Sequence, residues 1–555
     1  MCRLDLRQHK NPSYSLYVFI EKTALALFLA AICSTALVCC GQSEVRNEAE
    51  ILAEGDPEDS IQESDAVETA LGPIQGIAYE RSSAFLGIPY ASPPVGERRF
   101  ERPSPIEPWE NTFKATDYGP PCPQLGREGI SEDCLTLNIW TPKLQGDPAP
   151  VMVWIHGGGM RTGSSDNPFS VGRFIAEERG IVVVSLNYRL GPFGFLAHPS
   201  LGAASGNYGL WDQQAGLKWV QDHIAHFGGD PSNVTLMGES AGSASTCVHL
   251  ASPLSEGLFH KVIMQSGPCA SVGPDGMSPV VPKAEMESQG EALAQLLGCG
   301  PEANQAACLR SKSVDDILNG LPLVPGGIVL GEGVNWFPNI DGELIPDLPL
   351  SRILDGKVKP LPTIIGSTAD EGTVFAAAAE LIFVSGNDYI ERIEKRFGPL
   401  AQQVLAEYPP FAHGLPFHAL SKLLGDMVFV CPARQTARAL TASFAPTYLY
   451  SFDINPSYAS VMAFFGAFHA SEIPFVFHSL PEPLEFTSSE AAVSLEMVSY
   501  WTSFARHGHP NDAANVQWPL HGEEDRHLEI GSHGITVGRH LSRDNCDFWD
   551  SIWPQ

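Results

Sequence analysis

The stretch Val-Thr-Leu-Met-Gly-Glu-Ser-Ala-Gly at residues 234–242 decides the fold. Its first four residues are rich in apolar and β-branched side chains, which predicts a buried strand. The strand leads directly into the pattern G-x-S-x-G, with Ser240 at its centre, and a segment able to form a helix follows. A serine on a sharp turn between strand and helix projects its hydroxyl from the sheet, and the flanking glycines let neighbouring backbone approach closely. The stretch therefore predicts that Ser240 is a nucleophile.

Apolar segments on both sides of this stretch predict the rest of a sheet. They are short, rich in β-branched residues and bounded by glycine or polar turns, and they lie at residues 151–155, 181–186 and 363–365. Residues 211–227 instead repeat apolar side chains with helical spacing, and two glycines follow directly as a stop. This alternation predicts the α/β class, with a mostly parallel central sheet flanked by helices in one catalytic domain at residues 71–555.

Three consecutive glycines follow the expected strand at residues 151–155. They are Gly157, Gly158 and Gly159, preceded by His156. Glycines lack a Cβ, so their N–H groups can turn toward a substrate oxygen and form an oxyanion hole. The alternative is a flexible turn between a strand and a helix. Because the serine pattern is also present, we favour the oxyanion hole.

A serine nucleophile needs a base, because its hydroxyl is protonated at neutral pH, and the base needs a carboxylate that fixes its tautomer. Where the serine stands on a strand-to-helix turn of this kind, the acid follows it in the chain and the histidine comes last. Asp370 and Glu371 follow an expected strand, and His469 lies further on. Spacing alone does not choose Glu371 over Asp370, or His469 over His418 and His478.

The first 40 residues have the composition of an export signal. Basic residues precede an apolar run at residues 23–38 that contains no charge. At about 16 residues this run is shorter than the roughly 20 that span a bilayer, so we expect export rather than a transmembrane anchor. The run ends in a sequence that resembles a bacterial lipoprotein cleavage site, in which Leu37 stands three residues before Cys40. Lipidation at Cys40, with membrane attachment through that lipid, is therefore the alternative to simple cleavage and release.

Acidic residues dominate both the segment after the signal and the chain as a whole. Residues 41–70 are acidic and lack aromatic side chains, so we expect a disordered linker there. The whole chain has 34 basic and 64 acidic residues, a net charge of −30. This charge repels phosphate backbones, so nucleic acid is not an expected partner. We interpret the acidity as a soluble surface, with a site for a cationic partner as the alternative.

The cysteine count agrees with export to an oxidising compartment, periplasmic or extracellular. The chain has 12 cysteines, of which 4 lie in the first 40 residues, and the remaining 8 are an even number suited to disulfides. The sequence contains no H-E-x-x-H zinc motif, P-loop or dinucleotide fingerprint. Neither a metal nor an organic cofactor is therefore expected.

Further motifs follow one another along the body of the chain. They are FLGIPYA at residues 85–91, SEDCL at 131–135, NYRLG at 187–191 and GGDP at 228–231. Together with the serine and glycine motifs they resemble the type B carboxylesterase and cholinesterase family of α/β-hydrolases, including bacterial carboxylesterases similar to para-nitrobenzyl esterase. The resemblance covers almost the whole body and is specific, because chance does not assemble these motifs in this order.

The resemblance implies roles for individual residues. Ser240 would be the nucleophile, Glu371 the acid that orients the base, and His469 the general base. In this family the acid is the glutamate of an Asp-Glu-Gly triplet, which chooses Glu371. The oxyanion hole would be formed by the backbone N–H groups of Gly158, Gly159 and Ala241.

The resemblance also implies supporting residues and disulfides. Glu239, Ser266 and Glu472 match a polar network behind the catalytic histidine, and an ordinary buried hydrogen-bond network is the alternative. The implied disulfides pair Cys122 with Cys134, Cys299 with Cys308, and Cys431 with Cys546. Cys247 and Cys269 have no counterpart, and we favour buried free thiols over a fourth pair.

The expected function is the hydrolysis of a small-molecule carboxylic ester by water, through an acyl-enzyme on Ser240. The loop between Cys122 and Cys134 contains no aromatic residue. Cholinesterases carry a tryptophan there that binds the choline cation, so choline esters are disfavoured. The alternatives are a lipase, a polyester hydrolase, an amidase or a carbamate hydrolase, and a non-catalytic binding protein is disfavoured because the triad positions are intact.

Two features bear on the shape of the substrate pocket. Met160 follows the three glycines, where relatives commonly have an aromatic residue. Phe464, Phe465 and Phe468 lie close to His469 in the sequence. We interpret them either as the lining of an apolar acyl pocket or as ordinary core residues.

Overall fold

The computed structural model describes residues 62–143, 146–202, 205–267, 269, 280–300, 304–321, 334–379, 384–512, 515–522 and 524–552. Contacts divide the chain into two units, and the helices and strands of the described residues belong to the larger one, Ser60–Leu125 with Gly129–Gln555. The expected export signal at residues 1–40, with Cys40, and the expected linker as far as residue 61 lie outside the described residues.

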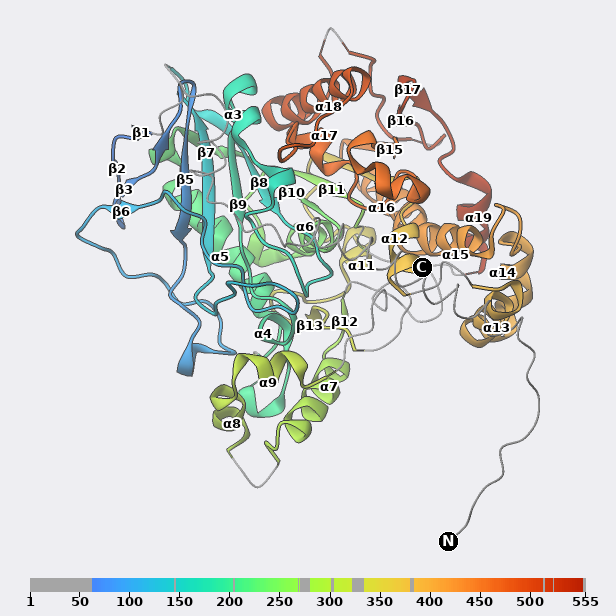
Figure 1. Ribbon diagram of the computed structural model, residues 1–555, viewed down its shortest axis with the longest axis horizontal. Coiled ribbons are helices and arrows are strands. Elements are labelled where there is room, and N and C mark those ends of the chain that lie inside the picture. Colours follow the sequence, from blue (N-terminus) through green and yellow to red (C-terminus); the bar gives the residue numbers. More distant parts are fainter. Residues whose placement is uncertain are drawn as a thin grey trace, which may run out of the picture. The chain divides into compact units, whose positions relative to one another are not determined.

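One large mixed sheet runs through this unit in the order β1-β4-β5-β7-β9-β8-β10-β11-β14-β15-β16-β17 (Figure 1). Its strands are β1 Gln62–Glu63, β4 Ile77–Ala78, β5 Ser82–Pro89, β7 Thr136–Pro142, β9 Val182–Leu186, β8 Ala149–Ile155, β10 Gly229–Glu239, β11 Lys261–Gln265, β14 Thr363–Thr368, β15 Thr447–Asp453, β16 His527–Gly531 and β17 Gly534–Gly538. Neighbours from β9 to β16 are parallel, and the pairs at both edges are antiparallel. The predicted α/β class and mostly parallel sheet are confirmed.

Two small sheets and a set of helices complete the unit. The small sheets pair β12 Val281–Pro282 with β13 Asn339–Ile340, and join β2 Val67–Thr69, β3 Gly72–Gln75 and β6 Phe113–Lys114. The helices are α3 Arg173–Arg179, α4 Gly191–Phe195, α5 Tyr208–His223, α6 Ala241–Ala251, α7 Lys283–Leu296, α8 Gln305–Ser311, α9 Val314–Asn319, α11 Pro349–Leu354, α12 Thr373–Ala378, α13 Gly386–Phe397, α14 Ala401–Glu407, α15 Pro416–Gly425, α16 Cys431–Ala442, α17 Ile473–Phe477, α18 Ser488–His507 and α19 Arg543–Ile552. A π-helical turn, η7 Asp426–Val430, joins α15 to α16.

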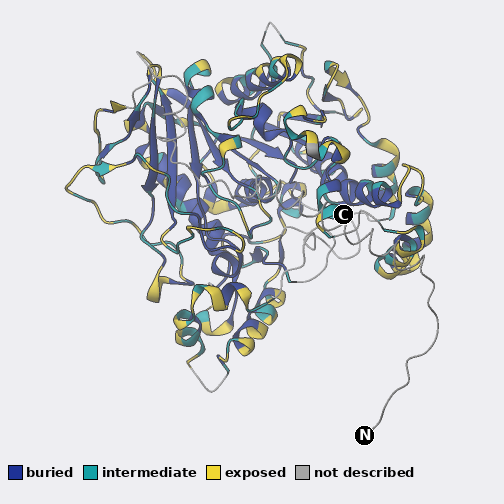
Figure 2. Ribbon diagram, in the orientation of Figure 1, coloured by how far each residue is buried: buried dark blue, intermediate teal, exposed yellow. Residues whose placement is uncertain are grey.

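The four strands predicted from apolar segments are β8, β9, β10 and β14 of the central sheet. Every residue of β8 is buried, and the central strands are dark blue in Figure 2. Val153 and Ile155 share an apolar cluster with Leu217 of α5, whereas Trp154, which points to the opposite face, packs edge-on against Phe477 of α17 at 5.0 Å. Helices therefore cover both faces of β8, which explains why its sequence is a continuous apolar run.

The ordered domain begins earlier than the boundary at residue 71 that the composition predicts. β1 pairs with β4 through Gln62 and Ala78, and β2 pairs with β3 through Val67 and Ile74. Val67 is half-buried against the main apolar cluster. Residues 62–69 therefore gain backbone hydrogen bonds and some apolar burial, which an argument from acidic composition does not take into account.

Four disulfides cross-link the described residues. Three are the pairs Cys122–Cys134, Cys299–Cys308 and Cys431–Cys546, which the resemblance implies, and the fourth joins Cys247 to Cys269. The preference for free thiols at Cys247 and Cys269 was therefore wrong. Cys247 lies on α6 and Cys269 follows β11, and their Cα atoms are 5.4 Å apart, within the range that a disulfide spans.

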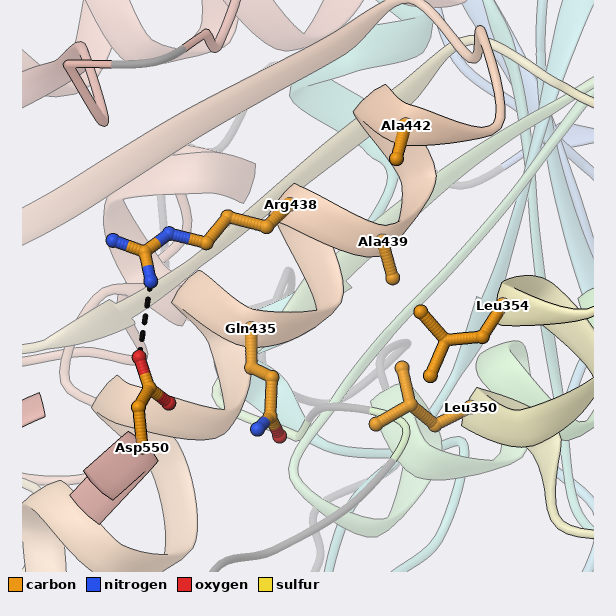
Figure 3. Close-up of a pocket in the computed structure, with 7 residues that line it drawn as sticks. All are labelled: Leu350, Leu354, Gln435, Arg438, Ala439, Ala442 and Asp550. Carbon is orange, nitrogen blue, oxygen red and sulfur yellow. Dashed lines mark hydrogen bonds and ion pairs between the residues drawn. The ribbon is translucent and has the colours of Figure 1, made fainter. Parts of the chain in front are cut away.

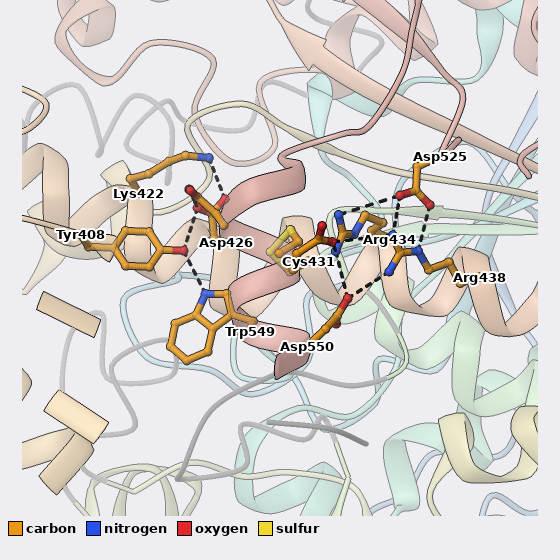
Figure 4. Close-up of a disulfide and its surroundings, with 12 residues drawn as sticks. Tyr408, Lys422, Asp426, Cys431, Arg434, Arg438, Asp525, Trp549 and Asp550 are labelled. Atoms are coloured by element: carbon orange, nitrogen blue, oxygen red, sulfur yellow. Dashed lines mark hydrogen bonds and ion pairs between the residues drawn. A yellow bond between two sulfur atoms is a disulfide. The ribbon is translucent and has the colours of Figure 1, made fainter. Parts of the chain in front are cut away.

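The disulfide Cys431–Cys546 fixes α19 to the start of α16 (Figure 4). Arg434 of α16 is buried, and its Nη2 donates to Asp547 at 2.7 Å and to Asp550 at 2.9 Å. Because a buried charge is costly without a partner, these carboxylates make the burial of Arg434 possible. The last helix is therefore held both covalently and electrostatically.

A second polar cluster joins α19 to the π-helical turn η7 (Figure 4). The buried carboxylate of Asp426 accepts hydrogen bonds from Tyr408 Oη at 3.1 Å, Lys422 Nζ at 2.7 Å and Asn545 Nδ2 at 2.6 Å. Trp549 Nε1 in turn donates to Tyr408 Oη at 2.9 Å. Residues of α19 therefore support the first residue of η7.

We expect removal of Cys431–Cys546 to destabilise the protein more than removal of Cys299–Cys308. The sequence separations are 115 and 9 residues, and a longer closed loop restricts the unfolded chain more strongly. On the chain-entropy model the difference is about 2 kcal/mol in the free energy of unfolding. Denaturation in urea of the two double cysteine-to-alanine variants, beside the parent, measures it. An equal or smaller loss in the Cys431→Ala, Cys546→Ala variant would contradict the prediction.

Candidate active site

Ser240 stands on a tight turn between β10 and α6. Its φ is 54° and its ψ is −122°, and its N–H donates to the carbonyl of Gln265 at 2.9 Å. A Cβ on Gly238 would lie 2.4 Å from the backbone of Gly242, and one on Gly242 would lie 2.0 Å from the carbonyl oxygen of Ile155. Both glycines of the pattern are therefore required by close backbone packing. Ser240 is half-buried, whereas its neighbours Glu239 and Ala241 are buried.

The glycine loop after β8 passes directly beside this serine. A Cβ on Gly157 would lie 2.6 Å from Glu239 Oε2 and 3.0 Å from Ser240 Cβ. Gly158 and Gly159 have φ values of 106° and 63°, which other residues rarely adopt. The N–H of Ala241 is at the N-terminus of α6, where it has no partner within the helix. The start of the glycine loop and the first residue of α6 therefore lie beside Ser240.

His469 pairs with Glu371 rather than with Asp370. Its Nδ1 lies 2.5 Å from Glu371 Oε2, and Glu371 is completely buried. The other carboxylate oxygen of Glu371 accepts the N–H of Thr368 at 2.7 Å, which fixes the orientation of the acid. The geometry therefore selects one of the two acidic residues that spacing alone leaves open.

The other two candidate histidines have different surroundings. His478 Nδ1 bonds to Ser494 Oγ at 2.7 Å, and His478 ends α17 in a left-handed conformation. His418 lies on α15, where its ring contacts those of Phe417 and Phe464. Neither ring has a contact with Glu371 among the described residues. They are interpreted as structural.

Asp370 holds the loop that carries His469. Its N–H donates to the carbonyl of Ala467 at 3.0 Å, and its Oδ2 accepts the N–H of Ala467 at 3.0 Å. Thr373 Oγ1 adds a hydrogen bond to the carbonyl of Phe465 at 2.9 Å. Burial raises the pKa of Asp370. Asp370 therefore positions the loop that carries His469, and Glu371 contacts the ring of His469.

Two further carboxylates lie near His469. Glu239 Oε1 is 3.0 Å from Nε2 of His469, without the alignment of a hydrogen bond, and Nε2 makes no hydrogen bond to Ser240. Glu472 is buried and accepts Gln265 Nε2 at 3.2 Å. Burial lowers the pKa of His469, but the carboxylates of Glu239 and Glu371 raise it by more, so the net shift is upward. Burial raises the pKa of both Glu239 and Glu472.

Ser266, the third residue expected in the supporting network, has a more local role. Its N–H donates to the carbonyl of Gly366 at 2.9 Å, and its φ is 51°. Its buried Oγ has no hydrogen-bond partner within the described part of the chain. Glu239 therefore lies at His469, and Glu472 bonds to Gln265. Within the described residues, the Ser266 side chain bonds to neither glutamate.

The aromatic residues around His469 are not the ones that lie near it in the sequence. Phe375 of α12 and Phe429 of η7 have ring centroids 4.9 and 4.7 Å from that of His469. Phe464 and Phe465 pack against Phe417 instead. Phe375 follows Glu371 by one helical turn, so sequence could have indicated it. Phe429 had no such signal, because the π-helical turn that presents it is not visible in the residue pattern.

A pocket of about 380 Å³ lies between α11, α16 and α19 (Figure 3). It is lined by Leu350 and Leu354, by one face of α16 and by Asp550. Arg438 is neutralised there by Asp550, with Nη1 and Oδ2 3.0 Å apart. The lining contains neither a nucleophile nor a histidine, so this pocket is not the candidate site.

The described residues contain no group of three or more histidine, cysteine or acidic side chains placed to hold a metal ion. Within the same residues, no helix is both long enough and apolar enough to cross a bilayer. The chemistry available at the candidate site is that of Ser240, His469, the nearby carboxylates and the backbone N–H groups.

The sequence is similar to those of known proteins. The profile of the Carboxylesterase family matches residues 63–549. An acetylcholinesterase from Bungarus fasciatus is 34% identical over 531 residues, which cover 88% of this chain and 86% of that protein. A cholinesterase from Mus musculus is 34% identical over 537 residues, which cover 88% and 87% of the two chains.

We expect Gly466→Ala to displace the loop that carries His469. Gly466 has a φ of 66°, and a Cβ there would lie 2.1 Å from Asp370 Oδ2, which also holds Ala467. A shift of about 1 Å in a reacting group can cost about 100-fold in rate, so labelling of Ser240 by an organophosphate should slow by at least about tenfold. The control is Gly414→Ala, because Gly414 also has a positive φ but no neighbour within 4 Å. Equal labelling rates in the two variants would contradict the prediction.

Proposed function

Because the chain belongs to the carboxylesterase family, we propose that Ser240, Glu371 and His469 are its catalytic triad and that it hydrolyses carboxylic esters through an acyl-enzyme. The observation that carries the proposal is the Glu371 carboxylate 2.5 Å from His469 Nδ1. This contact leaves Nε2, the other ring nitrogen, for the serine hydroxyl. The alternative of a non-catalytic binding protein is disfavoured, because such a protein has no need of a buried acid and a strained serine.

In the proposed cycle Nε2 of His469 takes the proton of Ser240 as its Oγ adds to the ester carbonyl. The negative oxygen that forms accepts hydrogen bonds from the N–H groups of Gly158, Gly159 and Ala241. His469 then gives the proton to the departing alcohol, and the acyl group stays on Ser240. Water, deprotonated by the same nitrogen, attacks the acyl group and releases the acid. Loss of one oxyanion donor typically costs about 2.7–4 kcal/mol of transition-state stabilisation.

Glu239 and the other buried carboxylates near His469 would change the pKa of this base. In the ground state Glu239 lies 3.0 Å from His469 Nε2, so the ring must turn or Glu239 must withdraw before Nε2 meets the serine. The positive imidazolium that forms during the reaction lies between Glu239 and Glu371. Both carboxylates therefore stabilise the charged state of His469, in which it donates its proton to the alcohol.

We propose an uncharged or anionic ester as the substrate rather than a choline ester. The disulfide loop of Cys122 and Cys134 contains no aromatic ring for a cation, whereas Phe375 and Phe429 offer an apolar wall at His469. A lipase and a polyester hydrolase are the other candidates that this wall allows. The similarity to bacterial para-nitrobenzyl esterase stays a prediction.

We also propose export of the chain with removal of its N-terminal signal. Four disulfides indicate an oxidising compartment. Lipidation at Cys40 would leave the enzyme on a membrane, and simple cleavage would release it. Mass spectrometry of the N-terminal peptide of the exported protein distinguishes the two.

A series of para-nitrophenyl esters from acetate to palmitate tests the proposed activity. We expect turnover of the short esters by the purified mature body and a loss of at least about 10⁴-fold in Ser240→Ala, because a triad acts as a unit. Preference for the long esters, with activation at an oil–water interface, would indicate a lipase. A folded protein that hydrolyses none of the series and resists organophosphate labelling would contradict the proposal.

The pH profile of kcat/KM should depend on Glu239. His469 must be neutral to accept the serine proton, and nearby carboxylates favour its charged form, so a raised pKa moves the acidic limb of the profile to higher pH. Glu239→Gln removes one carboxylate and should move that limb to lower pH by about one unit. The exposed Glu529 supplies a control in Glu529→Gln. An unchanged limb, or one at higher pH, would show that Glu239 does not set the pKa of His469.

A further inference from the structure

Arg161 is a half-buried cation beside the glycine loop of the site. Its N–H donates to the carbonyl of Gly158 at 3.1 Å, so its backbone belongs to the same turn as one of the proposed oxyanion donors. Its guanidinium donates through Nη1 to Asn335 Oδ1 at 3.4 Å, a long hydrogen bond to a neutral group. Nε and Nη2 have no hydrogen-bond partner among the described residues. The proposed chemistry of the triad does not use this side chain.

The chain neighbours of Arg161 and Asn335 lie in the same apolar cluster as Ala241. Met160 and Trp336 both belong to the apolar cluster that also contains Ala241. Met160 is buried in that cluster, and its carbonyl accepts the N–H of Gly191 at 2.7 Å. Arg161 and Asn335 therefore border the cluster that contains the proposed oxyanion donor Ala241, and the backbone of Arg161 belongs to the turn of Gly158.

The buried arginines of the described structure each form an ion pair with a carboxylate, whereas Arg161 has no such partner among the described residues. Arg99 is paired with Glu132, Arg189 with Asp212, and Arg434 with three aspartates. No carboxylate of the described residues forms an ion pair with Arg161, and burial lowers its pKa with no acidic group opposing the shift. A cation taken partly out of water without an opposite charge is costly, so such a group in a site points to an anionic ligand.

We propose that Arg161 binds a free carboxylate carried by the substrate, so that the preferred esters are anionic. This inference rests on the proposed function and names a substrate class for the same site. Each such substrate has one carboxylate, which the guanidinium binds, and one ester group, which lies at Ser240. The carboxylate can belong to the acyl part, as in a monoester of a dicarboxylic acid, or to the alcohol part, as in an ester of a hydroxybenzoate.

The chemistry of arginine and the charge of the chain both support this assignment. The planar guanidinium donates two parallel hydrogen bonds to a carboxylate, which gives direction as well as attraction. A net charge of −30 repels anionic molecules at a distance, so their binding requires a local cation. A neutral ester would leave Arg161 without an opposite charge, whereas an anionic ester would neutralise it inside the site.

Two matched substrate pairs test the proposal with the full mature body. Ethyl hydrogen adipate and ethyl hexanoate differ by a carboxylate on the acyl side, and para-acetoxybenzoate and para-tolyl acetate differ by one on the alcohol side. For at least one pair we expect Arg161→Gln to raise KM for the anionic ester by about 10- to 100-fold, and to change kcat/KM for its neutral partner by less than about threefold. Arg161→Lys, which keeps the charge without the planar fork, should retain part of the preference. Arg506→Gln, at an exposed arginine of α18, is the control for lost surface charge.

The outcomes separate this inference from the proposed function. Hydrolysis of the neutral esters by the parent and by Arg161→Gln shows that the fold and the triad are intact. A selective loss on the acyl-side or the alcohol-side anion supports the proposal and locates the carboxylate. Equal losses on anionic and neutral esters, or no loss on either anion, would overturn it. Failure of the parent on every ester would instead count against the proposed function.

Discussion

The positive φ of Ser240 is the constraint on which the rest of the site depends. A non-glycine residue at 54° is strained, and here it is held by backbone packing on both sides. Gly242 lies so close to Ile155 that a Cβ would overlap its carbonyl, and Gly238 packs against Gly242. Because β8 and β10 are neighbours in the sheet, the same contact brings the glycine loop after β8 to the serine after β10. Ser240 and the glycine loop are thus positioned by one strand pairing.

The histidine reaches this turn from the far part of the chain. It lies on a loop that Asp370 and Thr373 hold through backbone carbonyls and N–H groups, at the carboxyl end of β14. Parallel strands direct their carboxyl ends to one edge of the sheet, so residues more than 200 positions apart in the sequence converge there. The carboxylates of Glu239 and Glu371 lie at the two ring nitrogens of His469, and both raise its pKa.

Much of this arrangement could be predicted from the sequence. The apolar runs at β8, β9, β10 and β14 gave the strands, because residues buried on both faces must be apolar, and G-x-S-x-G located the turn. The choice of Glu371 over Asp370 needed the resemblance, since the two side chains are adjacent and only the fold directs one of them to the histidine. The pairing of Cys247 with Cys269 and the contact of Phe429 with His469 depend on tertiary packing. No local pattern encodes that packing. The strands at residues 62–69 were missed because pairing with distant backbone outweighs an acidic composition.

The polar cluster at Asp426 connects the last helix of the chain to the centre of the site. Asn545 and Trp549 support Asp426, directly and through Tyr408, and Asp426 begins the π-helical turn that presses Phe429 against His469. During synthesis, η7 leaves the ribosome more than 100 residues before α19 does. The surroundings of the histidine are therefore incomplete until the final segment has emerged, and their covalent lock at Cys431–Cys546 forms only where thiols are oxidised. The last helix of the chain thus completes the packing around His469.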